Sequence, residues 1–264
     1  MRALVMGILN VTPDSFSDGG RYLSTDAAVE HGLRLVAEGA DLVDVGGEST
    51  RPGAEPVAEE EERRRVVPVI RALAPSVRVS VDTRRASVAE AAVEAGATLV
   101  NDVSASLHQV AAAHRVGWVA MHMLGQPATM QAAPSYDDVV AEVRDFLRAR
   151  AAAGRRAGVP EIWVDPGIGF GKTTDHNLSL LRHLDELVAD GCPVAVGTSR
   201  KRFLGQLTGG AEVDDRVEAS VATAVWAVEK GAAMVRVHDV APVVQALRIA
   251  GEPVEVTPEE VVCR

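Results

Sequence analysis

The chain has 264 residues, with 27 basic and 37 acidic side chains, a formal net charge of −10 and 3% aromatic residues. This length suits one barrel of alternating strands and helices and can bury a sizeable core. The acidic balance argues against a nucleic-acid partner, which needs clustered Lys and Arg, but leaves a small anionic substrate open because a site can be locally basic.

Targeting and membrane signals are missing from the sequence. The first apolar run starts almost at Met1, with no signal-peptide pattern before it, and no apolar stretch reaches membrane-spanning length. The cysteines have neither CxxC nor metal-ligand spacing. We therefore expect a cytoplasmic protein that has no membrane partner.

Eight short apolar runs rich in β-branched residues follow one another along the chain, and each ends in polar residues. If they are parallel strands, all of these ends face the same way and converge on one mouth, where such barrels carry their chemistry. In chain order the runs lead to Asn10, 46–51, Asp82, Asn101, His122, Asp165, 199–201, and Arg236 with His238.

Segments with helical period separate these runs, so strands and helices alternate, as in a parallel sheet. We predict a (β/α)8 TIM barrel as a single domain over residues 1–250, followed by an acidic, mobile tail at 251–264. The predicted helices are 24–39 with a cap at Ser24–Asp26, 59–65 as a solvated charged face, 86–95, a short one within 106–115, 137–150 breaking up around Gly154 and Gly158, and 215–230.

Two long loops, 11–23 and 46–56, follow the first two predicted strands and should overhang the mouth. Both are rich in Gly, Pro, Ser and Asp. Long loops of this composition at the mouth of a barrel are usually functional lids.

One group of strand-end residues has the chemistry to hold a flat ring. A buried carboxylate needs donors, and a planar edge with adjacent N–H groups, such as an aminopyrimidinone, supplies two. Asp82, Asn101 and Asp165 could bind such an edge, and Lys201 could bind a carbonyl on the same ring. The alternative is that each acidic or amide residue caps the following helix, which we favour for any one of them alone.

The segment DPGIGFGKT (165–173) resembles a phosphate loop but has Pro166 where the Walker pattern requires glycine, and Lys172 at the last glycine position of the dinucleotide pattern. We reject both nucleotide-binding interpretations. Its glycines either let the backbone approach a flat ligand, with Phe170 as a wall, or simply form a turn.

A second group of residues suits an anion. Arg236 and His238 stand at alternate positions of a strand, and Thr50 and Arg51 follow another strand. Asn10 could offer its side-chain oxygen to Mg²⁺. The alternatives are a core histidine at 238 and a surface arginine at 51. His122 is a loop anchor or a ligand contact, and no nucleophile elbow or HExxH zinc motif is present.

Several long motifs resemble the dihydropteroate synthases, the sulfonamide-targeted enzymes of folate biosynthesis. The matching segments span nearly the whole chain in the family order: MGILNVTPDSFSDGG (6–20), DVGGESTRPG (44–53), SVDTRRASVAEAA (80–92), NDVS (101–104), MHMLGQPATMQ (121–131), DPGIGFGKTTDHNL (165–178), GTSRKRFLG (197–205) and VRVHDV (235–240).

The resemblance implies a homodimeric transferase with a barrel fold. It condenses p-aminobenzoate with the diphosphate ester of 6-hydroxymethyl-7,8-dihydropterin to give 7,8-dihydropteroate and pyrophosphate. Pyrophosphate leaves first in an SN1-like step, and the arylamine then attacks while the two mouth loops exclude water.

The resemblance also implies the roles of individual residues. The pterin would contact Asp82, Asn101, Asp165 and Lys201, with walls or backbone contacts at Met121, Phe170 and Gly197. The diphosphate would contact Asn10, Thr50, Arg51, Arg236 and His238, with Mg²⁺ bridging it to Asn10. The aminobenzoate would lie by Pro52, Phe170, Ser199 and Lys201. The catalytic set would be Asp82, Asp165, Lys201, Arg51, Arg236 and His238.

The chain departs from the family pattern after Ser104. The family usually continues with glycine and a longer helix, whereas this chain has Ala105, Ser106 and a short segment at 107–115. Two alternatives to the synthase are a methyltetrahydrofolate-binding methyltransferase and a non-catalytic pterin-binding paralogue. The STRPG loop and 199–201 argue against the first, and only the shortened helix supports the second.

Overall fold

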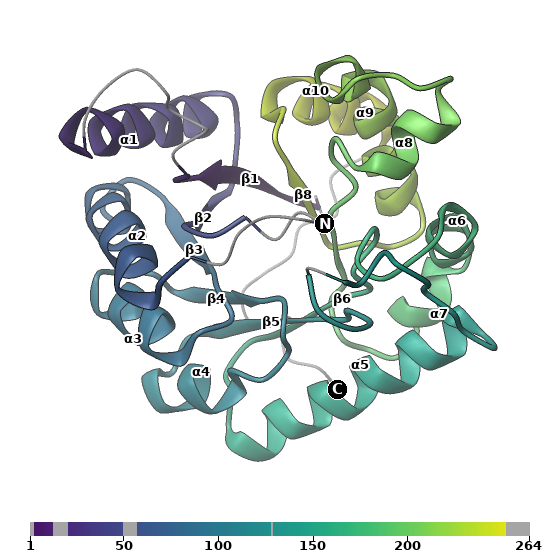
Figure 1. Cartoon of the computed structure of the whole chain (residues 1–264), viewed down its shortest axis with the longest axis horizontal. Coiled ribbons are helices and arrows are strands. Elements are labelled where there is room, and N and C mark those ends of the chain that lie inside the picture. The colour runs from purple at the N-terminus through teal and green to yellow at the C-terminus, as the bar shows by residue number, and fades with distance from the viewer. Residues whose placement is uncertain (1–2, 13–20, 50–56, 128, 252–264) are drawn as a thin grey trace.

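A ring of parallel strands surrounded by helices forms the computed structural model (Figure 1). It describes residues 3–12, 21–49, 57–127 and 129–251, with side chains in the first helix described from Thr25 onward. The strands are β1 (Leu4–Asn10), β2 (Leu42–Gly46), β3 (Arg78–Asp82), β4 (Leu99–Asp102), β5 (Gly117–Met121), β6 (Ile162–Asp165), β7 (Ala195–Val196) and β8 (Met234–Val237).

These strands pair in parallel in the order β6-β5-β4-β3-β2-β1-β8-β7. A parallel bridge between Val164 and Val194 links the two ends of this order, so the sheet is a nearly closed barrel. The predicted (β/α)8 architecture is confirmed, and every predicted strand is present.

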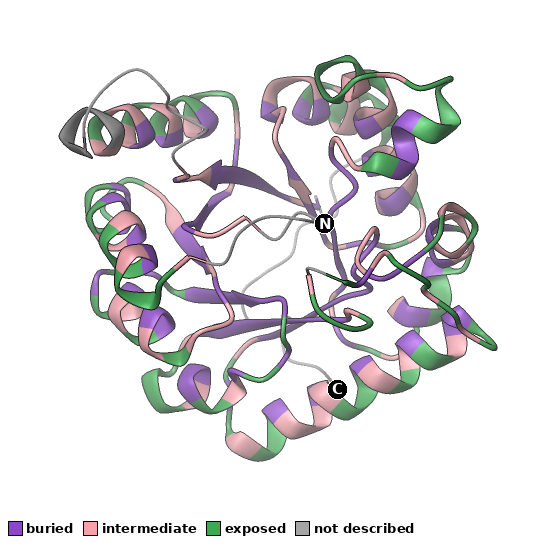
Figure 2. Ribbon diagram, in the orientation of Figure 1, coloured by how far each residue is buried: buried purple, intermediate pink, exposed green. Residues whose placement is uncertain are grey.

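Helices cover the outer face of the barrel, with their buried sides against the strands and their exposed sides outward (Figure 2). They are α1 (Arg21–Ala37), α2 (Glu59–Leu73), α3 (Ala86–Glu94), α4 (His108–His114), α5 (Val139–Ala157), α6 (Thr174–Arg182), α7 (Leu184–Val188), α8 (Arg202–Leu207), α9 (Val217–Glu229) and α10 (Val240–Ala250), with a 3₁₀ turn, η2 (Val213–Arg216), before α9.

Three helix predictions need correction. Helix α1 begins at Arg21, so the expected cap at Ser24–Asp26 lies inside the helix. Helix α5 continues through Gly154, where a Cβ would lie 2.9 Å from Ile162 Cδ1, and ends only at Gly158 with φ 83°. In the charged run at the start of α2, Glu62 is 1% exposed and does not belong to a solvated face.

The short fourth helix is confirmed. Helix α4 has 7 residues and ends at Arg115, which adopts a left-handed conformation with φ 55°. At the position where the family usually has glycine, Ala105 also has a left-handed φ, of 50°, and is fully buried. The backbone turn that a glycine would make easily is thus retained with an alanine.

The core divides into two clusters that alternate along each strand. One set of side chains packs between the strands and the helices and includes Val43, Val79 and Val235. The other set fills the inside of the barrel, as expected for a packed barrel interior. This inner plug consists of Met6, Leu42, Leu99, Val119, Trp163, Ala195 and Met234.

No helix in the part of the chain that the structure describes is long and apolar enough to cross a membrane. Apart from Gly251, the predicted tail lies outside the described residues, so its mobility stays a prediction.

Candidate active site

A layer of polar side chains lies directly above the inner plug. Asp44, Asn101, Asp165 and Arg236 each follow a plug residue by two positions on the same strand. Because side chains alternate along a strand, these residues point into the barrel on the side of the strand C-termini. The strand ends singled out from the sequence therefore meet at one mouth.

Arg236 is the centre of one half of this layer. Its Nε donates to Asp44 Oδ2 at 2.6 Å, and its Nη2 donates to Asp82 Oδ2 at 2.7 Å. Asn101 Nδ2 donates to the same Asp44 oxygen at 2.8 Å. Asp44, with 0% exposure, thus orients two of the predicted site residues, and Arg236 orients a third.

These contacts shift the pKa values of the charged groups. Burial raises the pKa of Asp82 to about 7, against the lowering effect of Arg236, and the neighbouring carboxylate of Asp44 adds to the rise. Burial acts to lower the pKa of Arg236, but the two carboxylates outweigh it and the net shift is upward. Arg236 therefore remains a permanent cation at the floor of the site.

Asp165 and Lys201 form the other half of the layer. Asp165 Oδ1 accepts a hydrogen bond from Gly167 N at 2.7 Å. Lys201 Nζ donates to the backbone carbonyl of Ile168 and lies 4.6 Å from the ring centroid of Phe170. The aromatic ring, the cation and the carboxylate border the same short loop after β6.

Burial raises the pKa of Asp165, while Lys201 opposes this rise. Burial also lowers the pKa of Lys201 to about 8, while Asp165 opposes that shift and Arg236 adds to it. These mutual effects on pKa reflect how close Asp165, Lys201 and Arg236 are to one another.

Gly197 lies between the two halves. A Cβ built on it would be 3.6 Å from Arg236 Cβ and 3.9 Å from Lys201 Nζ. Its missing side chain leaves the space between the arginine and the lysine open. The structure therefore brings the carboxylate, amide, lysine and arginine of the predicted site together at the mouth.

Ser199 and His238, predicted to serve different substrates, are in contact with each other. Ser199 Oγ lies 3.0 Å from His238 Nδ1, and His238 N donates to Ser199 Oγ at 3.1 Å. The loop after β7 is thereby fixed to the end of β8. His238 is half-buried at the rim, which does not agree with the alternative of a core histidine.

Asn10 and Met121 occupy the ends of β1 and β5. A Cβ on Gly46 would be 3.7 Å from both Asn10 Oδ1 and Asp82 Oδ2, which places both oxygens next to Gly46 at the mouth. Met121 is buried, and a Cβ on Gly167 would be 3.4 Å from its Cγ. Thr50, Arg51 and Pro52 lie outside the described residues, so their predicted roles are not tested.

The helix-capping alternative does not hold for Asp82, Asn101 or Asp165. The N-caps of the helices that follow them are Arg85, Leu107 and Thr173. The neighbouring Asp102 binds backbone amides instead: its Oδ2 accepts from the amides of Ser106 and Leu107, both at 2.6 Å. The three predicted site residues remain available for a ligand.

The glycines after Asp165 serve backbone packing. Gly167 and Gly171 have left-handed φ angles of 63° and 61°. A Cβ on Gly167 would lie 1.8 Å from the carbonyl oxygen of His122, and one on Gly171 would lie 2.4 Å from that of Leu124. The turn alternative therefore explains these two positions, whereas a Cβ on Gly169 would lie 3.0 Å from Lys201 Cδ, at the site itself.

Sequence reasoning missed Asp44. A signal was present, because Asp44 is a lone carboxylate within an apolar run and has the same strand parity as the inward-facing Leu42. An unpaired carboxylate at such a position is too costly to be incidental.

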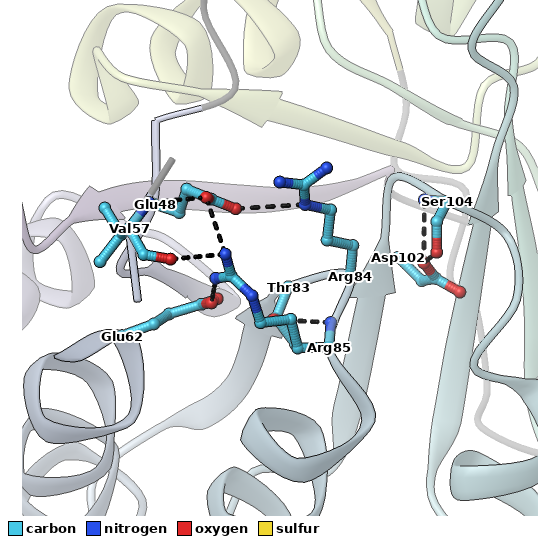
Figure 3. Close-up of polar contacts among 8 residues, drawn as sticks. All are labelled: Glu48, Val57, Glu62, Thr83, Arg84, Arg85, Asp102 and Ser104. Carbon is cyan, nitrogen blue, oxygen red and sulfur yellow. Dashed lines mark hydrogen bonds and ion pairs between the residues drawn. The ribbon is translucent and has the colours of Figure 1, made fainter. Parts of the chain in front are cut away.

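Sequence reasoning also missed a cluster of charged side chains behind the second mouth loop. Figure 3 shows Arg85 between Glu48 and Glu62. Its Nη1 donates to Glu62, and its Nη2 donates to Glu48 Oε1 at 3.0 Å and to the carbonyl of Val57 at 2.6 Å. Glu48 Oε1 also accepts from the Val57 amide at 3.0 Å. The charged run at 59–65, expected to be solvated, thus contributes Glu62 to a buried ion-pair network.

The arrangement offers two carboxylates and an amide to N–H groups, a lysine to a carbonyl, and an arginine and a histidine to an anion. Among the described residues, no group of three or more His, Cys, Asp or Glu side chains could hold a metal ion on its own.

Comparison with known proteins agrees with this geometry. The model of a protein family described as pterin binding enzyme matches residues 6–238. The dihydropteroate synthase of Mycobacterium leprae is 49% identical over 261 residues, which cover 94% of this chain and 92% of the relative.

Solved structures are equally similar. The dihydropteroate synthase of Xanthomonas albilineans with 4-aminobenzoic acid is 52% identical, with a TM-score of 0.88 and coverage of 94% of this chain and 92% of that one. The Yersinia pestis dihydropteroate synthase with a sulfonamide drug complex is 46% identical, with a TM-score of 0.88 and coverage of 94% and 93%.

Proposed function

This chain belongs to the dihydropteroate synthases of the pterin binding enzyme family, and we propose that it uses the mouth of its barrel to condense p-aminobenzoate with (7,8-dihydropterin-6-yl)methyl diphosphate. The products are 7,8-dihydropteroate and pyrophosphate. The observation that supports this most strongly is the meeting of Asp165, Lys201 and Arg236 around Gly197.

The pterin ring lies among the buried polar residues of the mouth. Asp165 accepts from the adjacent N–H groups of the aminopyrimidinone edge, Lys201 donates to the ring carbonyl, and Asn101 binds mixed donor and acceptor atoms. Asp82 binds a further ring N–H. Met121 and Phe170 form the walls, and Gly197 leaves room for the ring.

The diphosphate group lies towards β1 and β8. His238 and the guanidinium of Arg236 supply donors there, and Thr50 and Arg51 add donors from the second mouth loop. Donors that bind the diphosphate more tightly as negative charge builds on it accelerate its departure. No base is needed, because a neutral arylamine is already nucleophilic.

Mg²⁺ is the proposed cofactor. The donors fit it: a hard cation accepts an amide oxygen, and Mg²⁺ is usually held by one or two protein oxygens together with substrate phosphates and water. Asn10 Oδ1, next to Gly46 at the mouth, would be its protein ligand. When bound, the ion supplies neutralising charge to the diphosphate.

The aminobenzoate lies over Phe170 and Lys201, near Ser199 and Pro52. In the mechanism, the C–O bond to the diphosphate breaks first and both electrons leave with the pyrophosphate. Positive charge then spreads into the pterin, where the carboxylates of Asp82 and Asp165 stabilise it. The amine lone pair attacks the methylene carbon, and the displaced N–H proton leaves to solvent.

We also propose that the protein is a cytoplasmic homodimer that packs through its outer helices. Light scattering coupled to gel filtration tests the dimer, and a single-chain mass at micromolar concentration would contradict it.

The test of function is pyrophosphate release by the purified protein. With the pterin diphosphate and Mg²⁺ present, we expect release that depends on added p-aminobenzoate and gives a product with the mass of 7,8-dihydropteroate. Pterin binding without turnover would instead favour a non-catalytic paralogue. Methyl transfer from methyltetrahydrofolate would favour the methyltransferase.

A further inference from the structure

Lys172 is a buried lysine, with its pKa lowered by burial to about 7, that the proposed reaction does not use. Its residue is 3% exposed, and within the described part of the chain it forms no salt bridge. Its Nζ instead lies 2.9 Å from His122 Nδ1, 3.0 Å from the carbonyl oxygen of Gly167 and 3.1 Å from that of Phe170. A fourth, longer contact joins Nζ to the carbonyl oxygen of His122 at 3.5 Å, so the hydrogen-bond acceptors around this amine in the described part of the chain are all neutral.

The contact with His122 fixes the proton on that ring. Burial and the adjacent charge of Lys172 lower the pKa of His122 to about 3, so its ring is neutral. When Lys172 is protonated, Nδ1 must accept from it, and the ring proton lies on Nε2. The His122 ring packs edge-on against Phe146 with the centroids 5.0 Å apart. His122 is therefore a loop anchor, which was one of its two sequence interpretations.

The loop that Lys172 holds has unusual backbone partners. The carbonyls of five consecutive residues, 167–171, all accept hydrogen bonds from side chains. Such a segment has no sheet or helix to satisfy its carbonyls, so side chains from elsewhere must do so. Lys172 donates to the carbonyls of residues 167 and 170, and Lys201 donates to that of residue 168. Gln131 donates to the carbonyl of residue 169 at 2.5 Å, and Tyr136 to that of residue 171 at 2.8 Å.

Both ends of this carbonyl run belong to the candidate pocket. The amide of Gly167 donates to Asp165, and the ring of Phe170 lies 4.6 Å from Lys201 Nζ. Lys172 binds the carbonyls of Gly167 and Phe170 from the buried side of the loop. One ammonium group thus connects the backbone next to the carboxylate with the backbone of the aromatic wall.

We propose that Lys172 is a positioning residue for the pterin: by binding His122, Gly167 and Phe170 together, it holds Asp165 and the Phe170 ring at the spacing that the pterin ring requires. This inference rests on the proposed pterin site. It assigns a role to the lysine of the segment that imitates a phosphate loop, and no phosphate is involved.

The test compares the binding of two probes to Lys172→Met and to the unchanged protein by titration calorimetry. The probes are 6-hydroxymethylpterin, which needs Asp165 and Phe170, and inorganic pyrophosphate with Mg²⁺, which needs Asn10, Arg236 and His238. The Phe170 carbonyl and the His122 imidazole would lose their donor, and the Gly167 carbonyl would keep only the amide of Phe170. We expect the resulting displacement of Asp165 and Phe170 to weaken pterin affinity by about tenfold or more. We expect pyrophosphate affinity to stay within about twofold.

A protein that is merely destabilised would lose both affinities, so the difference between the probes is the decisive measurement. Lys172→Gln, which keeps two N–H donors without charge, provides a milder variant should Lys172→Met fold poorly. We expect an intermediate loss of pterin affinity from it. Lys230→Met removes an exposed lysine paired with Asp185 and is the matched control, with no expected change for either probe.

Asp165→Asn separates this inference from the assignment of the pocket. If Asp165→Asn weakens pterin binding while both Lys172 variants bind the pterin normally, the positioning role is wrong and the pocket stands. If Asp165→Asn leaves the pterin affinity unchanged, the pocket assignment is wrong, and the role of Lys172 fails with it. Equal losses of pterin and pyrophosphate affinity in Lys172→Gln would also overturn the inference.

Discussion

The two sides of the barrel mouth neutralise buried charge in different ways. Around β2, β3 and β8, cations meet carboxylates directly, as in the contacts of Arg236 with Asp44 and Asp82. Around β5, β6 and β7, the cations Lys172 and Lys201 meet backbone carbonyls instead. One side is an ion-pair network and the other is a lysine–carbonyl network.

Because of this difference, the arginine is held in a fixed position, whereas the lysine can exchange its hydrogen-bond acceptor for a ligand. The carboxylates hold Arg236 as a permanent cation, and removing either of them would leave the buried guanidinium with one charge partner instead of two. Lys201 has a pKa lowered to about 8, and its backbone acceptor carries no net charge. A ligand carbonyl can therefore replace that acceptor at little cost. This suits Lys201 to exchanging its partner for the substrate, whereas Arg236 presents a donor whose position is already fixed.

The largest effect is expected on the lysine side. Lys201→Ala and Asp165→Ala should each lower kcat/KM by about a thousandfold or more, because each removes a charged contact to the reacting ring in a site that excludes water. Steady-state pyrophosphate release measures this. Normal activity in either variant would show that contacts of Lys201 and Asp165 with the ring are not part of the reaction.

On the arginine side, the largest effect should be on stability. Asp44→Ala leaves Arg236 and Asn101 without their shared acceptor and should lower the free energy of unfolding by about 3–5 kcal/mol. Ser80→Ala is the control: Ser80 pairs with Asp44 in the sheet, and its buried hydroxyl has no partner among the described residues, so the change should stay within about 0.5 kcal/mol. Urea denaturation measures the free energy of unfolding of both variants. Similar losses in the two would show that the contacts of Asp44 with Arg236 and Asn101 do not stabilise the fold.

A second ion-pair cluster surrounds Arg85, three residues after β3, and a comparison with Arg78 at the start of β3 tests how much burial matters. Arg85→Lys cannot reach Glu48 and Glu62 together (Figure 3) and should cost about 2 kcal/mol or more. Arg78→Lys changes a half-exposed pair with Glu161 at the other end of β3 and should cost less than about 1 kcal/mol. A larger loss in Arg78→Lys would reverse this ranking.

The two sides should respond to pH in opposite directions. Burial raises the pKa of Asp82 from its ordinary 3.8 to about 7 in the folded state, so the folded state binds more protons between these values and stability falls as pH rises through that range. Burial lowers the pKa of Lys172 from its ordinary 10.5 to about 7, so here the unfolded state binds more protons and stability rises with pH from about 7 upward.

Each group can contribute up to about 1.4 kcal/mol per pH unit within its range. Urea denaturation from pH 7.5 to 9 should show a shallower rise in Lys172→Met, whereas Asp82→Asn should keep that rise and change the slope below pH 7. Identical slopes in all three proteins would show that neither shift exists.

The smallest effect is expected at the end of α4, away from both networks. Arg115 is exposed and left-handed at φ 55°, a conformation that costs an ordinary residue about 1 kcal/mol and a glycine very little. Arg115→Gly should therefore raise the free energy of unfolding by up to about 1 kcal/mol. A loss of stability would mean that the arginine side chain makes a contribution of its own.

The sequence alone determined the fold and most of the site. Runs of β-branched residues that end in Asn10, Asp82, Asn101 and Asp165 predict parallel strands whose ends share one face. The alternation of inward and outward side chains along each strand is a local property, so it can be predicted without coordinates. The family motifs supplied the roles of these residues.

Only the tertiary structure decided which polar residues serve the ligand and which serve each other. Asp44, Glu62 and Lys172 lie in sequence patterns that suit a strand, a solvated helix and a phosphate loop. Their partners are far along the chain: 192 positions separate Asp44 from Arg236, and 50 separate Lys172 from His122. Hydrogen bonding and desolvation depend on distances in space, which no local pattern of residues records.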